Sequence, residues 1–123
     1  MMKMVPLFRV DDMQAALVFY TSLLDFELAE WDSPDDHVVS LFRGEAELML
    51  TRLATDQVAR VNAHLVVQDV DELFELWRGR GLDQSDRSGS PVHLGPVDQS
   101  WGTREFYVTD PDGNTLRIVQ RPG

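Results

Sequence analysis

Apolar residues recur every three or four positions in two stretches of the chain, one after Asp12 and one after Asp69. This spacing places apolar side chains on one face of a helix. Each aspartate stands at the start of its stretch, where a carboxylate accepts hydrogen bonds from the free N–H groups of the first turn. The pattern therefore predicts two amphipathic helices, the second ending at Gly79 or Gly81. Their apolar positions are Met13, Ala16, Leu17, Tyr20, Leu23 and Leu24 in the first, and Val70, Leu73, Phe74 and Trp77 in the second.

Short segments rich in β-branched and aromatic residues lie on both sides of each predicted helix. Near the end of the chain, Asp110–Asn114 reads DPDGN, in which Pro111 and Gly113 suit a tight hairpin. The sequence therefore predicts the order βαβββ twice. The strands are expected over 4–10, 26–31, 37–43, 46–52, 62–68, 104–109 and 115–120, with one short strand around Pro91–Leu94 inside the less clear stretch Gln84–Ser100.

Two segments of the chain, Val10–Phe26 and Val67–Asp83, align with each other without gaps. Each contains the end of a predicted strand, an acidic cap and a predicted helix. Such an internal repeat indicates two copies of one structural unit. Because 123 residues is the size of one ordinary domain, we expect a single domain over 1–123, with module one at about 1–56 and module two at about 60–123.

The charge balance is acidic, since 11 Lys and Arg stand against 21 Asp and Glu, a net charge of −10. Such a surface suits neither nucleic-acid phosphates nor anionic lipids, so we expect no nucleic-acid and no membrane partner. It would favour a cationic ligand. The chain has no Cys, which excludes disulfides, thiolate metal sites and cysteine nucleophiles. Since the first ten residues resemble neither a secretion signal nor an anchor, we expect a cytoplasmic protein.

Three features together carry a family resemblance: the two βαβββ units, the FY dipeptide of Phe19 and Tyr20, and the ending REFYVTDPDGNTLRIVQ. They resemble the vicinal oxygen chelate superfamily, which includes glyoxalase I, extradiol dioxygenases, fosfomycin-resistance proteins and bleomycin-resistance proteins. The segment VDQSWGTREFYVTDPDGN looks most like the bleomycin-resistance branch. The resemblance implies an α+β protein with the glyoxalase/bleomycin-resistance fold. In this fold two tandem βαβββ modules form a curled mixed sheet, with the helices outside and the ligand inside the cup.

Side chains alternate along a strand, and this alternation divides them between the helix-packed face and the cup. On the first strand we expect Phe8 and Val10 to pack beneath the helix, and Leu7 and Arg9 to face the cup. The other residues expected to face the cup are Val5, Glu47, Met49, Thr51, Asn62, His64, Val66, Glu105, Tyr107, Thr109, Thr115 and Arg117.

Enzymes that this chain resembles hold one divalent ion on His and Glu side chains, so the resemblance also implies four ligand positions. Matched residue by residue, these positions fall on Val5, Met49, Asn62 and Arg117. Valine has no donor atom, and a guanidinium has no lone pair and would repel the ion. We therefore expect no metal ion and no cofactor.

The bleomycin-resistance branch implies a non-catalytic homodimer that sequesters a small-molecule ligand, a bulky cationic glycopeptide antibiotic, in clefts at the dimer interface. Aromatic side chains would stack on flat rings of such a ligand, and Glu47 and Glu105 would attract its cationic tail. Arg9, Arg104 and Arg117 would repel that tail unless they are paired with Glu47 or Glu105. No catalytic residue is expected, and the expected ligand-binding residues are Trp31, Phe42, Glu47, Met49, Asn62, His64, Trp101, Glu105, Tyr107 and Arg117.

Two other functions stay open on the sequence. One is a divalent-metal-dependent lyase, epimerase or dioxygenase of the superfamily, with displaced ligands drawn from His64, Glu47 and Glu105. The other is a binding module for a different ligand, with a housekeeping or regulatory role. Of these functions, sequestration without catalysis is favoured over enzymatic activity. The two remaining histidines, His37 and His93, are expected at the surface.

Overall fold

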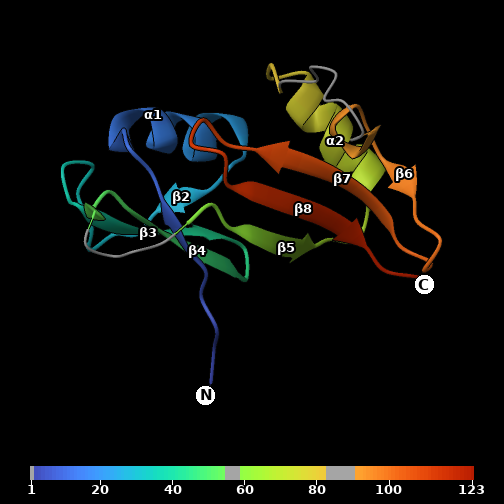
Figure 1. Ribbon diagram of the computed structural model, residues 1–123, viewed down its shortest axis with the longest axis horizontal. Helices are drawn as coiled ribbons and strands as arrows, with labels where there is room; N and C mark the ends of the chain where they lie inside the picture. Colours follow the sequence, from blue (N-terminus) through green and yellow to red (C-terminus); the bar gives the residue numbers. More distant parts are fainter. Residues whose placement is uncertain (1, 55–58, 83–90) are drawn as a thin grey trace. The chain divides into compact units, whose positions relative to one another are not determined.

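The computed structural model describes residues 2–54, 59–82 and 91–123 of the chain (Figure 1). Within this described part, no helix is long and apolar enough to cross a membrane. The chain divides into two compact units, and each unit carries one four-stranded sheet. The first unit comprises Met1–Val61 and Asp110–Asn114, and the second comprises Asn62–Thr109 and Thr115–Gly123.

The sheet of the first unit has the strand order β1-β4-β3-β2. Strand β1 runs parallel to β4, and the other neighbours are antiparallel. A helical segment connects β1 to β2; it begins as the α-helix α1 and continues as the π-helical turns of η1. The elements are β1 (Leu7–Arg9), α1 (Met13–Leu17), η1 (Val18–Leu23), β2 (Glu27–Leu28), β3 (Val38–Arg43) and β4 (Ala46–Thr51).

The first helix begins at the predicted cap, because the Asp12 side chain accepts a hydrogen bond of 3.1 Å from the Ala15 N–H. Beyond α1 the helix widens into π-helical turns, in which the Leu24 N–H donates to the Phe19 carbonyl five residues earlier, at 3.3 Å. The apolar spacing of the sequence predicts a helix here but does not reveal the wider turns. Tyr20 is nevertheless buried, as expected for the inward face.

The sheet of the second unit repeats this arrangement with the strand order β5-β8-β7-β6. Strand β5 runs parallel to β8, and the other neighbours are antiparallel. The predicted α+β fold of two βαβββ modules is therefore confirmed, with one mixed sheet in each module. The elements are β5 (Asn62–Val66), α2 (Val70–Arg78), η3 (Pro91–His93), β6 (Val97–Asp98), β7 (Arg104–Thr109) and β8 (Thr115–Gln120).

Helix α2 begins and ends where the sequence predicts. The Asp69 side chain accepts a backbone hydrogen bond of 3.0 Å from the first turn, and the helix ends at Gly79. Its apolar face packs on one face of the sheet, where the rings of Phe74 and Trp77 lie 5.2 and 5.9 Å from the ring of Phe106. The sheet side chains that alternate with Phe106 therefore point away from α2.

The prediction of a short strand around Pro91–Leu94 is wrong. Pro91–His93 instead form a 3-10 turn, in which the Leu94 N–H donates to the Pro91 carbonyl at 2.9 Å. Proline has no N–H to contribute to a sheet, which disfavours a strand that starts there. The short strand of this module is Val97–Asp98. Residues 83–90, which make up most of the unclear stretch, lie outside the described residues.

Burial alternates along the strands as predicted. On β1, Phe8 is fully buried while Leu7 is partly exposed, and on β5, Leu65 is more buried than His64. Two of the residues expected to face the cup, Thr51 and Glu105, are buried. The Thr51 hydroxyl accepts a backbone hydrogen bond just beyond the end of β4.

Asp110–Asn114 forms the predicted tight turn between β7 and β8. Its two end residues, Asp110 and Asn114, are buried polar residues of the first unit. Gly113 has a φ of +89°, which favours glycine. The Tyr20 hydroxyl donates to Asp110 Oδ2 at 2.8 Å, and the Asn114 side-chain amide donates to the Arg9 carbonyl at 2.9 Å. Within the first unit, the turn is therefore hydrogen-bonded to β1 and to the first helix.

Candidate functional site

Half of the predicted ligand residues lie on the face of the second sheet that points away from α2. In the strand ladders, Arg117 stands opposite Tyr107 of β7 on one side and opposite His64 of β5 on the other. Glu105, two residues before Tyr107, shares the same face, and so does Asn62. Arg117 therefore occupies the middle of this face.

Glu105 is buried, with 1% of its surface exposed, and three donors surround its carboxylate. The Thr103 hydroxyl and the Trp101 indole N–H donate to Oε2 at 2.5 and 3.2 Å, and an Arg117 N–H donates to Oε1 at 3.0 Å. Burial alone would raise the pKa of Glu105, but these hydrogen bonds outweigh it and leave the pKa below its ordinary value. Glu105 is therefore a carboxylate at neutral pH, with both oxygens engaged.

Tyr107 links this carboxylate cluster to a histidine that the sequence places at the surface. The guanidinium carbon of Arg117 lies 4.8 Å from the centre of the Tyr107 ring, and the His93 ring packs edge-on at 5.7 Å. His93 is only partly exposed, and its Nε2 is 2.9 Å from the Thr109 hydroxyl. Burial raises the pKa of Tyr107. The expectation that His93 is a surface residue is wrong, because η3 turns its ring toward the sheet.

Trp101 stands in the turn between β6 and β7 and is 61% exposed. The turn is closed by a hydrogen bond of 2.8 Å from the Gln99 N–H to the Thr103 carbonyl, and Gly102 within it has a φ of +100°. The indole N–H donates to Glu105, so the polar edge of the ring is held while much of the ring remains open to solvent. This combination suits a stacking surface for a flat ring.

The first unit has an aromatic pair of its own. Trp31 is 73% exposed, and its ring packs edge-on against Phe42 at 5.7 Å. Lys3 Nζ lies 5.6 Å from the Phe42 ring centre and pairs with Glu47 Oε1 at 2.7 Å. Met49 shares the sheet face of Phe42 and Glu47, two positions further along β4. Glu47 is therefore already engaged by a cation of the chain.

The structure thus gathers the ten predicted ligand residues into two clusters, one in each unit. A chain of contacts runs from Trp101 to Glu105, from Glu105 to Arg117 and from Arg117 to Tyr107, and Trp31, Phe42 and Glu47 form the other group. Met49, Asn62 and His64 belong to these groups by strand register alone. Thr103 and His93 belong to the group in the second unit but are not predicted from the sequence. Both are common residue types outside the strands, and no pattern in the sequence marks them.

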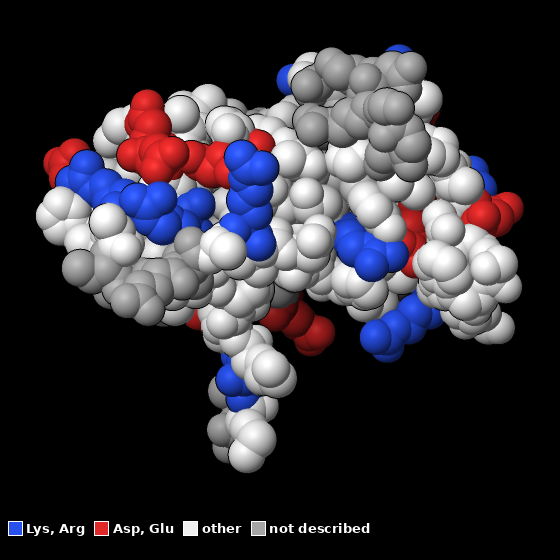
Figure 2. All heavy atoms as spheres, viewed as in Figure 1, with Lys and Arg blue, Asp and Glu red and all other residues white. Residues whose placement is uncertain are grey.

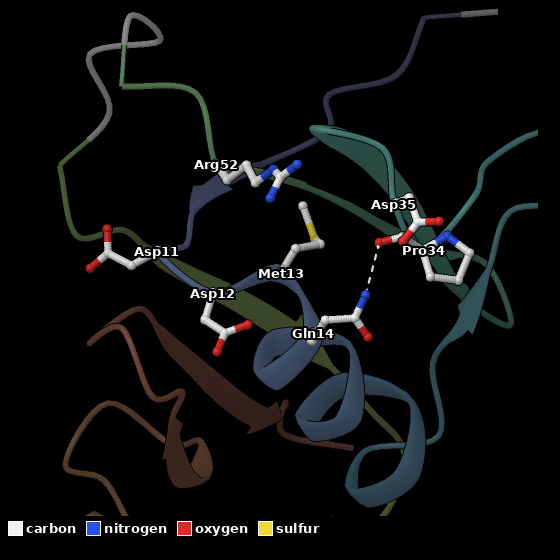
Figure 3. A pocket seen from close by; sticks show the side chains of 7 residues that line it. All are labelled: Asp11, Asp12, Met13, Gln14, Pro34, Asp35 and Arg52. Atoms are coloured by element: carbon white, nitrogen blue, oxygen red, sulfur yellow. Dashed lines mark hydrogen bonds between the residues drawn. The ribbon is translucent and has the colours of Figure 1, made fainter.

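The first unit also contains two surface pockets that the sequence does not predict. The larger has a volume of about 380 Å³ and lies beside the start of α1, where Figure 3 shows the Gln14 amide donating to the Pro34 carbonyl at 3.4 Å. The smaller, of about 200 Å³, is lined by Arg9, Asp11, Ala59, Arg60, Asp112 and Asn114. Neither contains a predicted ligand residue; the larger is lined by Asp11, Asp12, Met13, Gln14, Pro34, Asp35 and Arg52.

The residues at the expected metal positions do not suit a divalent ion. Arg117 at one of them is bound to Glu105, and Met49 at another offers only a thioether, a poor ligand for a hard cation. Among the residues that the structure describes, no three His, Asp or Glu side chains come together as a metal cluster. The displaced set of His64, Glu47 and Glu105 is likewise not assembled within that part of the chain.

Charged side chains of both signs are mixed on the face of the molecule that Figure 2 shows. The Arg104 guanidinium pairs with Asp71 at 2.9 Å and with Asp98 at 3.1 Å. The hydrogen bond from Arg104 lowers the pKa of Asp71. The positive charge of Arg104 is therefore already compensated by carboxylates of the chain.

Comparisons with known proteins bear on the fold and the family. A family model described as the glyoxalase/bleomycin resistance protein/dioxygenase superfamily matches residues 5–118. Among solved structures, a bleomycin-binding protein complexed with bleomycin is 22% identical with a TM-score of 0.78, and the match covers 98% of this chain and 99% of that one. A bleomycin-binding protein from bleomycin-producing Streptomyces verticillus, complexed with copper(II)-bleomycin, is 27% identical with a TM-score of 0.68 and coverage of 100% and 97%.

An enzyme has a similar fold. A lactoylglutathione lyase from Agrobacterium tumefaciens is 17% identical, with a TM-score of 0.71 and coverage of 97% of this chain and 92% of that one. No curated protein sequence matches the chain. The similarity to solved structures therefore extends to binding proteins and enzymes, and the residues of the site must decide between them.

Proposed function

Because the chain belongs to the glyoxalase/bleomycin resistance protein/dioxygenase superfamily, we propose that it binds a small molecule without converting it. The ligand is a bulky cationic antibiotic of the bleomycin type, which the protein sequesters. The observation that carries this proposal is the pair of exposed indole rings, Trp31 and Trp101, each held at its edge by neighbouring side chains. Exposed aromatic rings of this kind suit flat heteroaromatic groups.

The arrangement of charges supports a cationic ligand. The three arginines that would repel one each have a carboxylate partner: Arg117 pairs with Glu105, Arg9 with Asp11, and Arg104 with Asp71. Pairing cancels most of their charge at close range, while the chain as a whole keeps a net charge of −10. A cation approaching the protein is therefore attracted by the overall field and meets little local repulsion.

The residues at the former metal positions favour binding over catalysis. Superfamily enzymes act through a divalent ion, and Val5, Met49, Asn62 and Arg117 do not provide a ligand set for one. The two bleomycin-binding relatives bring the ligand class to this proposal, since each is complexed with bleomycin or its copper(II) form.

A homodimer is part of the proposal. On β5, Asn62, His64 and Val66 are exposed, on the sheet face that α2 does not cover. Val66 is 45% exposed, and an open sheet face with an apolar residue of this kind is suited to a second copy of the chain. The antibiotic would then lie in clefts between the two copies.

Calorimetric titration with metal-free bleomycin tests the proposal. EDTA-treated protein is expected to bind with a Kd of about 1 µM or tighter, which corresponds to about −8 kcal/mol. Trp101→Ala is expected to weaken binding by about 1 kcal/mol or more with little change in Tm, because the exposed ring contributes to stacking and not to the core. Leu76→Ala, another exposed apolar residue but on α2, is the matched control and should bind like the wild type. Absence of binding by the wild type would contradict the proposal.

A further inference from the structure

We propose that Glu105 is a positioning residue, which fixes the Trp101 ring in the orientation that stacks on a planar aromatic ring of the ligand. This inference rests on the proposed binding function and deepens it. It assigns to Glu105 a role that differs from direct attraction of a cationic tail. Its basis is the set of contacts around one buried carboxylate.

Glu105 is poorly placed to bind a ligand itself. Only 1% of its surface is exposed, and each of its oxygens already accepts at least one hydrogen bond. Its charge is compensated by Arg117 at 3.0 Å. A cation in solution therefore gains little from this carboxylate, whereas the groups that donate to it are strongly held.

One of those donors is the exposed ring. The indole N–H of Trp101 lies 3.2 Å from Glu105 Oε2, and the Trp101 backbone belongs to a closed turn in which Gly102 adopts a left-handed conformation. Both ends of the side chain are thus restrained, although the ring is 61% exposed. An exposed tryptophan without such a restraint would lose rotamer freedom when a ligand stacks on it, and this loss weakens binding by roughly two- to tenfold.

The chemistry at position 105 requires a carboxylate. Thr103, Trp101 and Arg117 are all donors, and they approach two different oxygen atoms. A glutamine amide has a single acceptor oxygen and would direct its NH₂ group at one of these donors. In Glu105→Gln the single acceptor oxygen stays with the cationic Arg117, the strongest of the three donors, and the NH₂ group turns toward Thr103, whose hydroxyl can accept from it, so the indole loses its acceptor. The lowered pKa of Glu105 agrees with this arrangement, since all three donors favour the charged form.

Time-resolved fluorescence anisotropy of the ligand-free protein tests the restraint directly. In a Trp31→Phe background, the remaining tryptophans are Trp101 and Trp77, and Trp77 is fully buried. Glu105→Gln is expected to increase the amplitude of the fast depolarisation component, because the indole gains local motion. Glu75→Gln is the matched control: it makes the same substitution at a carboxylate that pairs with Arg78 on α2, outside the predicted ligand residues, and it should resemble the background protein.

A second variant protects the test against a folding defect. Glu105→Asp keeps a negative charge near Arg117 but withdraws the oxygen from the indole, so it is expected to show the same increase in fast motion. Titrating the wild type and the same substitutions in the wild-type background with metal-free bleomycin should give a Kd that is two- to tenfold weaker for both Glu105 variants and unchanged for Glu75→Gln.

The two measurements separate the inference from the proposed function. If ring motion does not change in folded Glu105→Gln or Glu105→Asp, the positioning role is wrong whatever the ligand result. If ring motion increases but both Glu105 variants bind bleomycin with the same Kd as a wild type that binds it, the role is wrong as well. If the wild-type protein does not bind bleomycin at all, the proposed ligand is wrong, and the anisotropy result alone decides whether Glu105 positions the ring.

Discussion

The Tyr20 hydroxyl donates a hydrogen bond of 2.8 Å to Asp110 Oδ2, and both residues are buried. This contact joins the first helix to the turn between β7 and β8, although the helix and the turn are far apart in the sequence. Burial raises the pKa of Tyr20, and the negative charge of Asp110 adds to the effect. The phenol therefore stays protonated as a donor well into alkaline pH.

Tyr20→Phe should destabilise the protein by about 1–3 kcal/mol, because the buried Asp110 oxygen loses a donor that water cannot replace. Chemical denaturation measures the change in the free energy of unfolding. Phe19→Leu, next to it but partly exposed, is a control for changes in ring packing. A loss below about 0.5 kcal/mol for Tyr20→Phe would mean that the hydrogen bond contributes little to stability.

The charge on Glu105 should make stability depend on pH in the acidic range. Its pKa in the folded protein lies below the ordinary value of 4.5, so the unfolded chain binds the proton more readily than the folded one. Stability from this group is complete above pH 4.5 and declines as the pH falls through the lowered folded value. The difference in unfolding free energy between the wild type and Glu105→Gln should shrink over that window. A constant difference would contradict the ionised, hydrogen-bonded state.

Divalent metal ions should not bind at a specific site in the purified protein. Arg117 stands at one of the ligand positions that the resemblance implies; its guanidinium is held by Glu105 and offers no lone pair. Calorimetry with zinc, nickel and manganese on EDTA-treated protein should show only weak, non-stoichiometric binding. A tight site with one ion per chain would instead favour the metal-dependent enzyme with displaced ligands.

The protein should form a homodimer at micromolar concentration, and light scattering should give twice the mass of one chain. Val66→Glu places a charge on the exposed face of β5 and is expected to shift the protein toward monomer. Leu76→Glu introduces the same charge on the exposed side of α2 and should leave the dimer intact. A monomeric wild type would remove the interface cleft from the proposed function.

Much of the fold follows from local chemistry that the sequence displays. The caps Asp12 and Asp69, the end of α2 at Gly79 and the alternating burial on β1 all rest on interactions within a few residues. The π-helical widening of η1 and the 3-10 turn that begins at Pro91 could not be predicted in this way. Helical spacing does not distinguish an α-helix from a π-helix, and a short apolar run does not distinguish a strand from a 3-10 turn. The single domain with two modules stays a prediction.

The site was less predictable than the fold. The sequence selects Trp101 and Glu105 as separate ligand residues, but only the three-dimensional contacts reveal that one is bonded to the other. The role of Thr103 likewise depends on a turn whose shape places its hydroxyl beside Glu105. Long side chains that meet across neighbouring strands, such as Arg117 and Glu105, depend on register, which a one-residue slip would reverse.

Sequestration without conversion is the central claim, and one measurement tests it most directly. EDTA-treated protein is saturated with metal-free bleomycin, the complex is isolated, and the ligand is released with denaturant and analysed by mass spectrometry. The account predicts saturation at one ligand per chain, with a Kd of about 1 µM or tighter, and recovery of bleomycin with unchanged mass. A titration without saturation, or a ligand recovered with altered mass, would contradict it.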